Sequence, residues 1–154
     1  MSFKDWLCGA LGCCTYDSNI PPPNIVGNTN WTELHSVLKS EYGESTIIML
    51  SDNNYKLATL NSFKDFLSDD NTNYYHYTGD PGIDCDNFAE ILAGRTAIPG
   101  WGQVPIGTCW LSNPAHAVNI FVDENITPWL CEPQTDGLFR ISDKNNWKAH
   151  IIWL

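Results

Sequence analysis

Three residues in the second half of the chain are of the types that together perform nucleophilic chemistry: Cys85, His116 and Glu132. Cys85 stands at the start of a predicted helix, where free backbone N–H groups and the helix dipole favour a thiolate. His116 has an ordinary pKa of about 6.5, which suits proton exchange with a thiol. Glu132 could orient the imidazole as the third member of a triad. The set indicates nucleophilic catalysis by a thiolate.

Each residue of this set also has an ordinary structural interpretation. A lone Cys in an apolar helix usually belongs to the core, a His at a strand edge is usually a hydrogen-bonded structural residue, and a Glu before Pro is usually solvated. Asp84 and Asp86 flank Cys85, and their negative charge disfavours a thiolate unless a positive group compensates. A bound cation would supply that charge.

The predicted elements place these residues on one helix and two neighbouring strands. Apolar residues recur on one face of residues 84–94, which predicts a buried helix that begins at Cys85. Apolar runs bounded by Pro, Gly, Asn and Asp predict strands at 103–110, 116–122, 129–132, 138–141 and 150–154. His116 begins the second of these strands and Glu132 ends the third. A turn at 123–127 would bring the two side chains together.

The first half of the chain predicts helices and a single strand. Residues 30–33 resemble a capping box and begin a helix expected from Trp31 to about Tyr42. Residues 46–50 predict a strand, and residues 62–67 predict a short helix capped by Ser62. Helices followed by an antiparallel meander give an α+β fold in which the Cys-bearing helix packs against a twisted sheet.

Length and charge limit the partners that this chain can have. Its 154 residues suffice for one domain, and 18 acidic against 8 basic residues give a formal net charge of −10. No cluster of Lys and Arg could neutralise a row of phosphates, which argues against nucleic acid and anionic membrane surfaces. No stretch approaches the roughly 20 apolar residues of a membrane span. The oligomeric state is left open.

The N-terminal segment stands apart from the rest of the sequence. Residues 1–24 are predicted to form a short segment with a Pro-rich linker, and residues 25–154 a single domain. Residues 6–14 are apolar and lack the basic flank of a signal peptide, and they predict a short helix with small buried thiols, although lipidation or pairing of these cysteines is open. Without a secretory signal we expect a cytoplasmic protein with free thiols, or a virion-associated one if it is phage-encoded.

Three motifs carry a resemblance to a known family. They are Asp84-Cys85-Asp86-Asn87-Phe88-Ala89, His116-Ala117-x-Asn119 and Trp129-Leu130-x-Glu132-Pro133-Gln134-Thr135-Asp136. Together they resemble the papain-like cysteine protease domain at the C-terminus of the fairy-ring mushroom agglutinin and of related small microbial and phage proteins, over residues 60–154. The resemblance implies a papain-like fold and a catalytic triad of Cys85, His116 and Glu132. It also implies a cysteine peptidase or amidohydrolase acting on a peptide or protein substrate.

The resemblance further implies a calcium ion beside the triad. The positions that match the family's ligands are Asp86, Asn87, Glu132 and Gln134. Ca²⁺ takes roughly six to eight oxygen ligands, which carboxylates and amides can supply, whereas the ordinary alternative is that Asp86 and Asn87 only cap the helix. The agglutinin's β-trefoil sugar-binding half has no counterpart here, so no lectin activity is implied. The alternative function is a non-catalytic protein-binding or virion structural module on the same fold.

Overall fold

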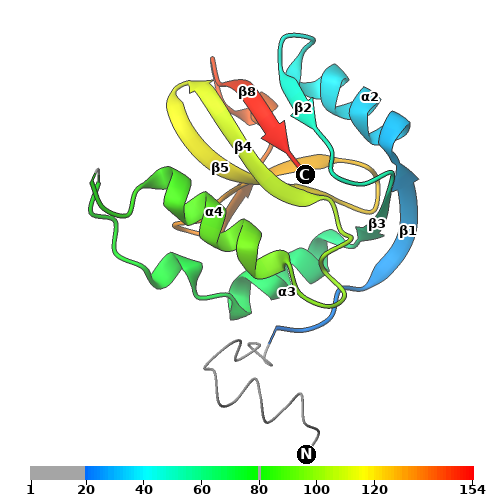
Figure 1. The fold of residues 1–154 in the computed structure, drawn as a ribbon, viewed down its shortest axis with the longest axis horizontal. Coiled ribbons are helices and arrows are strands. Elements are labelled where there is room, and N and C mark those ends of the chain that lie inside the picture. The colour runs from blue at the N-terminus through cyan, green and yellow to red at the C-terminus, as the bar shows by residue number, and fades with distance from the viewer. Residues whose placement is uncertain (1–19, 80) are drawn as a thin grey trace, which may run out of the picture.

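The computed structural model describes residues 20–79 and 81–154, so the helix predicted within residues 6–14 lies outside the described residues. The elements in chain order are β1 (Ile25–Asn30), α2 (Trp31–Tyr42), β2 (Ile47–Met49), β3 (Asn54–Ala58), α3 (Leu60–Asp69), η1 (Thr72–Tyr74), α4 (Cys85–Thr96), β4 (Ile106–Asn113), β5 (Ala115–Val122), β6 (Pro128–Glu132), β7 (Gly137–Phe139), η2 (Ile141–Asp143) and β8 (Lys148–Trp153). Figure 1 shows their arrangement. The predicted α+β class is confirmed.

Helix α2 begins and ends where the sequence predicts. The side chain of Asn30 accepts a hydrogen bond of 3.0 Å from the backbone N–H of Glu33, which is the expected N-cap. Gly43, at a φ of 92°, ends the helix and donates its N–H to the carbonyl of Lys39. Leu34 and Leu38 of α2 are fully buried, so the helix is held in place by its packing against the sheet.

Helix α3 begins earlier than the sequence predicts. Its N-cap is Thr59, whose hydroxyl accepts a hydrogen bond of 3.2 Å from the N–H of Ser62. Ser62, the predicted cap, lies inside the first turn, where its hydroxyl accepts a hydrogen bond of 2.9 Å from the N–H of Asn24. The prediction was wrong by one turn because two hydroxyl residues, spaced three apart, can both act as a cap.

The main sheet has six strands in the order β2-β8-β4-β5-β6-β7. Strands β4 to β7 form the predicted antiparallel meander. The last strand does not extend that meander, because β8 returns to pair with β4, and β2 pairs with β8 in parallel. The expectation of a purely antiparallel meander was therefore wrong. A periodic pattern of apolar residues predicts a strand, but it does not predict the strand with which it pairs.

A second sheet was not predicted from the sequence. Strands β1 and β3 pair in antiparallel fashion, with a register irregularity between Ile25 and Gly27. Residues 25–30 contain Gly and three polar residues, and residues 54–58 follow a turn-like run, so neither segment shows a clear strand pattern. Their pairing is decided by tertiary packing: the buried side chains of Tyr55 and Leu57 alternate along β3.

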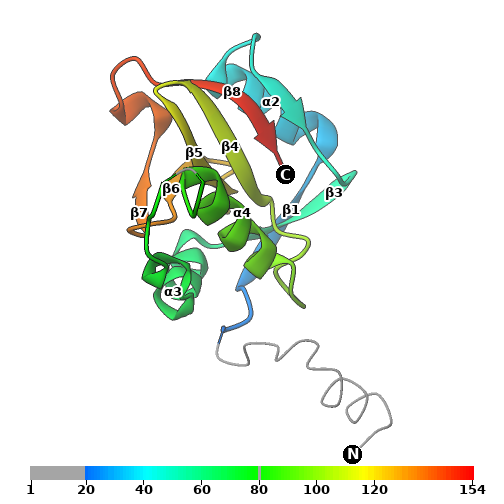
Figure 2. The same ribbon diagram turned by 60° about the vertical axis from the view of Figure 1, so that its left-hand side comes forward.

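The main sheet is covered on both faces, with α2 on one side and α3 and α4 on the other (Figures 1 and 2). On the α2 face, residues of α2 pack against strand side chains of one parity, and this core includes Leu34, Leu38, Val118, Ile120, Leu130 and Ile152. On the other face, residues of α3, α4 and the loop after α4 pack against strand side chains of the other parity, and this core includes Phe63, Phe66, Leu92, Trp101, Phe121 and Cys131. The face that each strand residue occupies therefore decides which helix it can meet.

The described end of the predicted linker lies against this second core. Ile20 is buried there, and the carbonyl of Pro21 accepts a hydrogen bond of 2.8 Å from the indole N–H of Trp101. The division into residues 1–24 and 25–154 stays a prediction. No helix in the described part of the chain combines the length and apolar character that crossing a membrane would need.

Candidate functional site

The structure brings together two of the three residues predicted to act on a substrate. His116 is the second residue of β5 and Glu132 is the last residue of β6. The imidazole Nε2 lies 2.7 Å from Glu132 Oε2. The β5–β6 register pairs Asn119 with Cys131, so His116 and Glu132 are diagonal neighbours on one face of the sheet. Both side chains are about one-fifth exposed. The predicted contact between the His and the Glu is confirmed.

The helix that carries Cys85 packs against the opposite face of the sheet. His116 shares its face of β5 with Val118 and Ile120, which belong to the core under α2. Asn119 points the other way and donates a hydrogen bond of 2.8 Å to the carbonyl of Ala89 in α4. Among the described residues, no hydrogen bond joins Cys85 to His116 or Glu132. A complete triad thus stays a prediction.

The pair of His116 and Glu132 opens onto a cavity of about 490 Å³. Its lining comes from the sheet and from the segment before β8: His116, Glu132, Thr135, Gly137, Leu138, Phe139, Lys144 and Trp147. Trp147 meets His116 edge to face, with ring centroids 6.2 Å apart. The ammonium of Lys144 lies 4.7 Å from the ring centroid of Phe139 and 5.4 Å from that of Trp147. Cys85 does not line this cavity.

The three described cysteines differ in burial. Burial raises the pKa of the Cys109 thiol to about 12. The pKa of Cys131 is also raised well above its usual value, first by burial and then by the nearby carboxylates of Asp136, Glu132 and Asp70. These two thiols stay protonated at neutral pH, whereas Cys85 is only partly buried. Cys85 is therefore the accessible thiol of these three.

The four predicted calcium ligands lie in two separate places. Asp86 Oδ1 accepts a hydrogen bond of 3.0 Å from the N–H of Asn87, and Asn87 Oδ1 accepts one of 3.1 Å from the N–H of Asp84. Gln134 Nε2 donates to Glu132 Oε1 at 3.4 Å. Among the described residues, no group of three or more His, Cys, Asp or Glu side chains could hold a metal ion. The arrangement fits the helix-capping alternative, and the calcium site stays a prediction.

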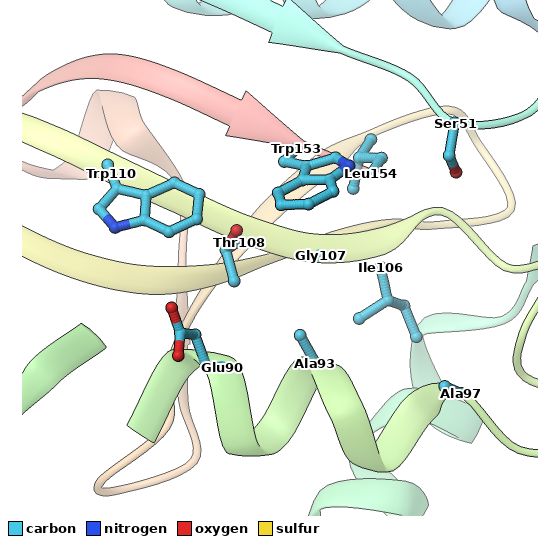
Figure 3. A pocket seen from close by; sticks show the side chains of 10 residues that line it. All are labelled: Ser51, Glu90, Ala93, Ala97, Ile106, Gly107, Thr108, Trp110, Trp153 and Leu154. Carbon is cyan, nitrogen blue, oxygen red and sulfur yellow. The ribbon is translucent and has the colours of Figure 1, made fainter. Parts of the chain in front are cut away.

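A second cavity, of about 500 Å³, lies between α4 and the strands β4 and β8 (Figure 3). We call it the tryptophan groove; it is lined by Ser51, Glu90, Ala93, Ala97, Ile106, Gly107, Thr108, Trp110, Trp153 and Leu154. The indoles of Trp110 and Trp153 lie along the strand wall, Glu90 and Ala93 project from the facing helix, and Ala97 follows directly after its end. The side chain of Trp153 is 55% exposed.

Strand register builds the wall of the groove. Thr108 and Trp110 alternate with core residues along β4, and Trp153 of β8 is the direct partner of Thr108. The two tryptophans are therefore diagonal neighbours on the same face. The strands approach closely because position 107 is Gly: a Cβ there would lie 1.8 Å from the carbonyl oxygen of Trp153.

One buried amide fixes the distance between the helix and the wall. The side-chain N–H groups of Asn119 donate to the carbonyl of Ala89 in α4, at 2.8 Å, and to the carbonyl of Gly107 in β4, at 3.0 Å. The small side chains of Ala93 and Ala97 then leave the space between α4 and the sheet open. The cavity is therefore a consequence of these contacts.

Sequence reasoning missed the tryptophan groove. The signal in the sequence was the alternation that puts Thr108 and Trp110 on one face of a strand, together with a tryptophan close to the end of the strand predicted at 150–154. That signal was insufficient because the pairing of β8 with β4, which brings Trp153 beside Trp110, is a long-range contact.

No protein-family model matches the chain, and no curated protein matches it in sequence. Solved structures do match it. One is described as a PSL1a–E64 complex, with 20% identity and a TM-score of 0.67 over 82% of this chain and 50% of that chain. Another is a Polyporus squamosus lectin bound to the human-type influenza-binding epitope Neu5Acα2-6Galβ1-4GlcNAc, with 20% identity and a TM-score of 0.66 over 82% of this chain and 49% of that one.

These neighbours correct the functional prediction. The chain spans about half the length of the solved structures and shares the fold of that part of a mushroom lectin. The neighbours are lectins, so the predictions of a cysteine peptidase and of a peptide or protein substrate are contradicted. A papain-like protease domain is not shown by them either. The physical reason lies in the sheet: the Cys85 helix α4 packs on the face to which Asn119 points, whereas the side chains of the His116–Glu132 pair lie on the other face.

Proposed function

We propose that this protein binds carbohydrate in the tryptophan groove. The observation that carries the proposal is the pair of indoles, Trp110 and Trp153, side by side on one wall and opposite the carboxylate of Glu90. A pyranose ring has flat faces of C–H groups and a rim of hydroxyl groups. Indole faces make apolar contacts with the C–H faces of the sugar, and a few polar side chains bind and orient its hydroxyl groups.

The polar lining of the groove suits hydroxyl groups. Glu90 offers a carboxylate that accepts hydrogen bonds, and Thr108 and Ser51 offer hydroxyls that both donate and accept. Thr108 of the strand wall is buried, whereas Glu90 of the facing helix and Ser51 are exposed. A sugar ring laid against the indoles would therefore find hydrogen-bonding partners on more than one side.

The exposure of Trp153 also supports a ligand at this place. Leaving 55% of a tryptophan side chain in water forgoes the free energy that burial of its apolar area would provide. A ligand that covers the indole recovers part of that free energy. One solved neighbour is described as a lectin bound to a carbohydrate epitope, which supports carbohydrate as the class of ligand, although that description belongs to a protein of about twice this length.

The test is a screen of the full chain against an array of neutral, amino and acidic oligosaccharides, followed by calorimetry with the saccharide that binds best. We expect Trp153→Ala to weaken its binding at least about tenfold, because truncating a stacked tryptophan removes a dominant contact. Trp153→Phe should retain part of the affinity. Intrinsic fluorescence should also change on saturation, since both groove tryptophans become covered.

The matched control is Trp31→Ala. Trp31 is 40% exposed, its ring stacks on His35 with centroids 4.6 Å apart, and it belongs to α2, which covers the face of the sheet opposite to α4. Its loss should leave saccharide binding within twofold of the unmodified protein. Absence of binding to every saccharide on the array, or equal binding by the Trp153→Ala and Trp31→Ala variants, would refute carbohydrate binding in the groove.

A further inference from the structure

We infer that the tryptophan groove selects saccharides that carry a free, protonated amine and rejects acidic saccharides. This inference rests on the proposed function and adds the class of ligand. The lining of the groove contains one ionisable side chain, Glu90, and no Lys, Arg or His. An amine placed beside that carboxylate gains Coulomb energy, and a sugar carboxylate placed there loses it.

The negative charge of Glu90 lies close to an indole against which a sugar ring could stack. Figure 3 shows its carboxylate projecting from α4 toward the strand wall close to Trp110. An ammonium group on a ring stacked against Trp110 would face the carboxylate on one side and the negative face of the indole on the other. Both interactions favour a cation, because the ring quadrupole attracts positive charge. Both disfavour an anion for the same reason.

The rest of the protein strengthens this preference. The basic residue of α4, Arg95, pairs with the buried Asp70 at the end of α3, so its charge is engaged away from the groove lining. The formal net charge of −10 gives an approaching cation a favourable long-range field. The solved lectin neighbour is described in complex with an epitope that contains Neu5Ac, which is an acidic sugar. The groove of this chain has no cationic side chain to receive such a carboxylate.

The test compares two probes of equal length and linkage. They are the β-1,4-linked tetrasaccharide of glucosamine and its fully N-acetylated, neutral counterpart, measured by calorimetry at pH 6, where the amine is protonated. We expect the glucosamine tetramer to bind about fivefold more tightly at low ionic strength, which corresponds to one exposed ion pair. The preference should shrink at 500 mM NaCl, because salt screens an exposed pair. A sialylated trisaccharide should show no measurable binding.

The variant Glu90→Gln tests whether Glu90 causes the preference for the glucosamine tetramer. It should remove most of the difference between the two tetramers and leave the affinity for the neutral one within twofold. The control Glu44→Gln removes the same charge from an exposed position outside the groove and should keep the preference. Equal binding of both tetramers by the unmodified protein, tight binding of the sialylated probe, or equal effects of the two variants would overturn the inference. If no saccharide binds at all, the proposed function itself fails.

Discussion

At the scale of single residues, Asp136 has a carboxyl group in surroundings that disfavour its ionised form. It lies in the turn between β6 and β7 at a φ of 57°, and its Oδ2 accepts a hydrogen bond from the side chain of Asn73. Burial and the nearby carboxylate of Asp70 raise its pKa from 3.8 to about 6, and the hydrogen bond from Asn73 opposes that shift. The folded protein therefore binds a proton here more tightly than the unfolded chain does.

This difference predicts a dependence of stability on pH. Stability is highest below the unfolded pKa of 3.8 and falls as pH rises toward about 6. Asp136→Asn removes the titrating group, keeps an acceptor for Asn73, and is tolerated in the left-handed region. We expect the variant to be more stable than the unmodified protein at pH 7, by about 1 kcal/mol at most because the site is partly solvated.

Urea denaturation at pH 3.5 and pH 7 measures this effect. The gain in free energy of unfolding should be present at pH 7 and nearly absent at pH 3.5. The control Asp52→Asn changes an exposed carboxylate and should show no such change between the two pH values. A gain of equal size at both pH values would mean that Asp136 acts through packing and not through its charge.

At the scale of elements, the sequence predicted those that local signals define. Helix α2 carries its own cap and stop residues, and α4 begins at Cys85 as expected, so both could be identified without the rest of the chain. Strands β1 and β3 carry no such pattern and form because they pair with each other. The pairing of β8 with β4 is a long-range contact, and local sequence patterns likewise could not predict it.

In the candidate site too, the feature defined by local sequence was predicted and the feature that depends on tertiary packing was not. The contact of His116 with Glu132 followed from two neighbouring strands joined by a short turn, and it was predicted. The position of Cys85 relative to that pair depends on which face of β5 the helix α4 covers. Strand β5 is buried on both faces along most of its length, so the sequence pattern does not tell its two faces apart.

Asn119 is the residue through which β5 joins these elements, and it carries the next prediction. It is fully buried, and its amide bridges the carbonyls of Ala89 and Gly107. Asn119→Ala leaves both carbonyls without this donor and opens a small cavity. We expect a loss of about 1–3 kcal/mol in the free energy of unfolding, measured by urea denaturation. Saccharide binding should weaken as well, because α4 is no longer tied to the wall of the groove.

The comparison variant for this test is Asn125→Ala. Asn125 is exposed in the turn after β5, and among the residues that the structure describes only its backbone N–H takes part in a hydrogen bond, with Asp123. The substitution should change stability by less than about 0.5 kcal/mol. If both variants lost the same stability, the bridge between α4 and β4 would contribute nothing beyond the general cost of removing an asparagine.

At the scale of the whole molecule, the fold depends on the last strand returning to a place inside the main sheet, next to its β2 edge. Strand β8 lies between β2 and β4, so it joins the first half of the chain to the meander of the second half. It also supplies Trp153 to the groove and Ile152 to the core under α2. A disturbance of the β4–β8 pairing should therefore affect both the stability of the whole protein and the binding of ligand.

Gly107 is the position at which this dependence can be tested. A Cβ there would lie 1.8 Å from the carbonyl oxygen of Trp153, and backbone cannot yield as a flexible side chain does. Gly107→Ala must therefore push β8 away from β4, and we expect a loss of about 2 kcal/mol or more in the free energy of unfolding. The remaining folded protein should bind the glucosamine and N-acetylglucosamine tetramers at least about tenfold more weakly, because the two indoles no longer lie side by side.

Gly94→Ala makes the same chemical change where there is room for it. Position 94 lies within α4, and a Cβ there meets nothing within 4 Å, so alanine should stabilise the helix by about 0.5–1 kcal/mol. Urea denaturation of both variants, with calorimetry on the folded fraction, separates the two effects. A Gly107→Ala variant that kept normal stability and normal saccharide binding would show that the chain end can shift without cost. The pairing of β8 with β4 would then not be what positions Trp153 in the groove.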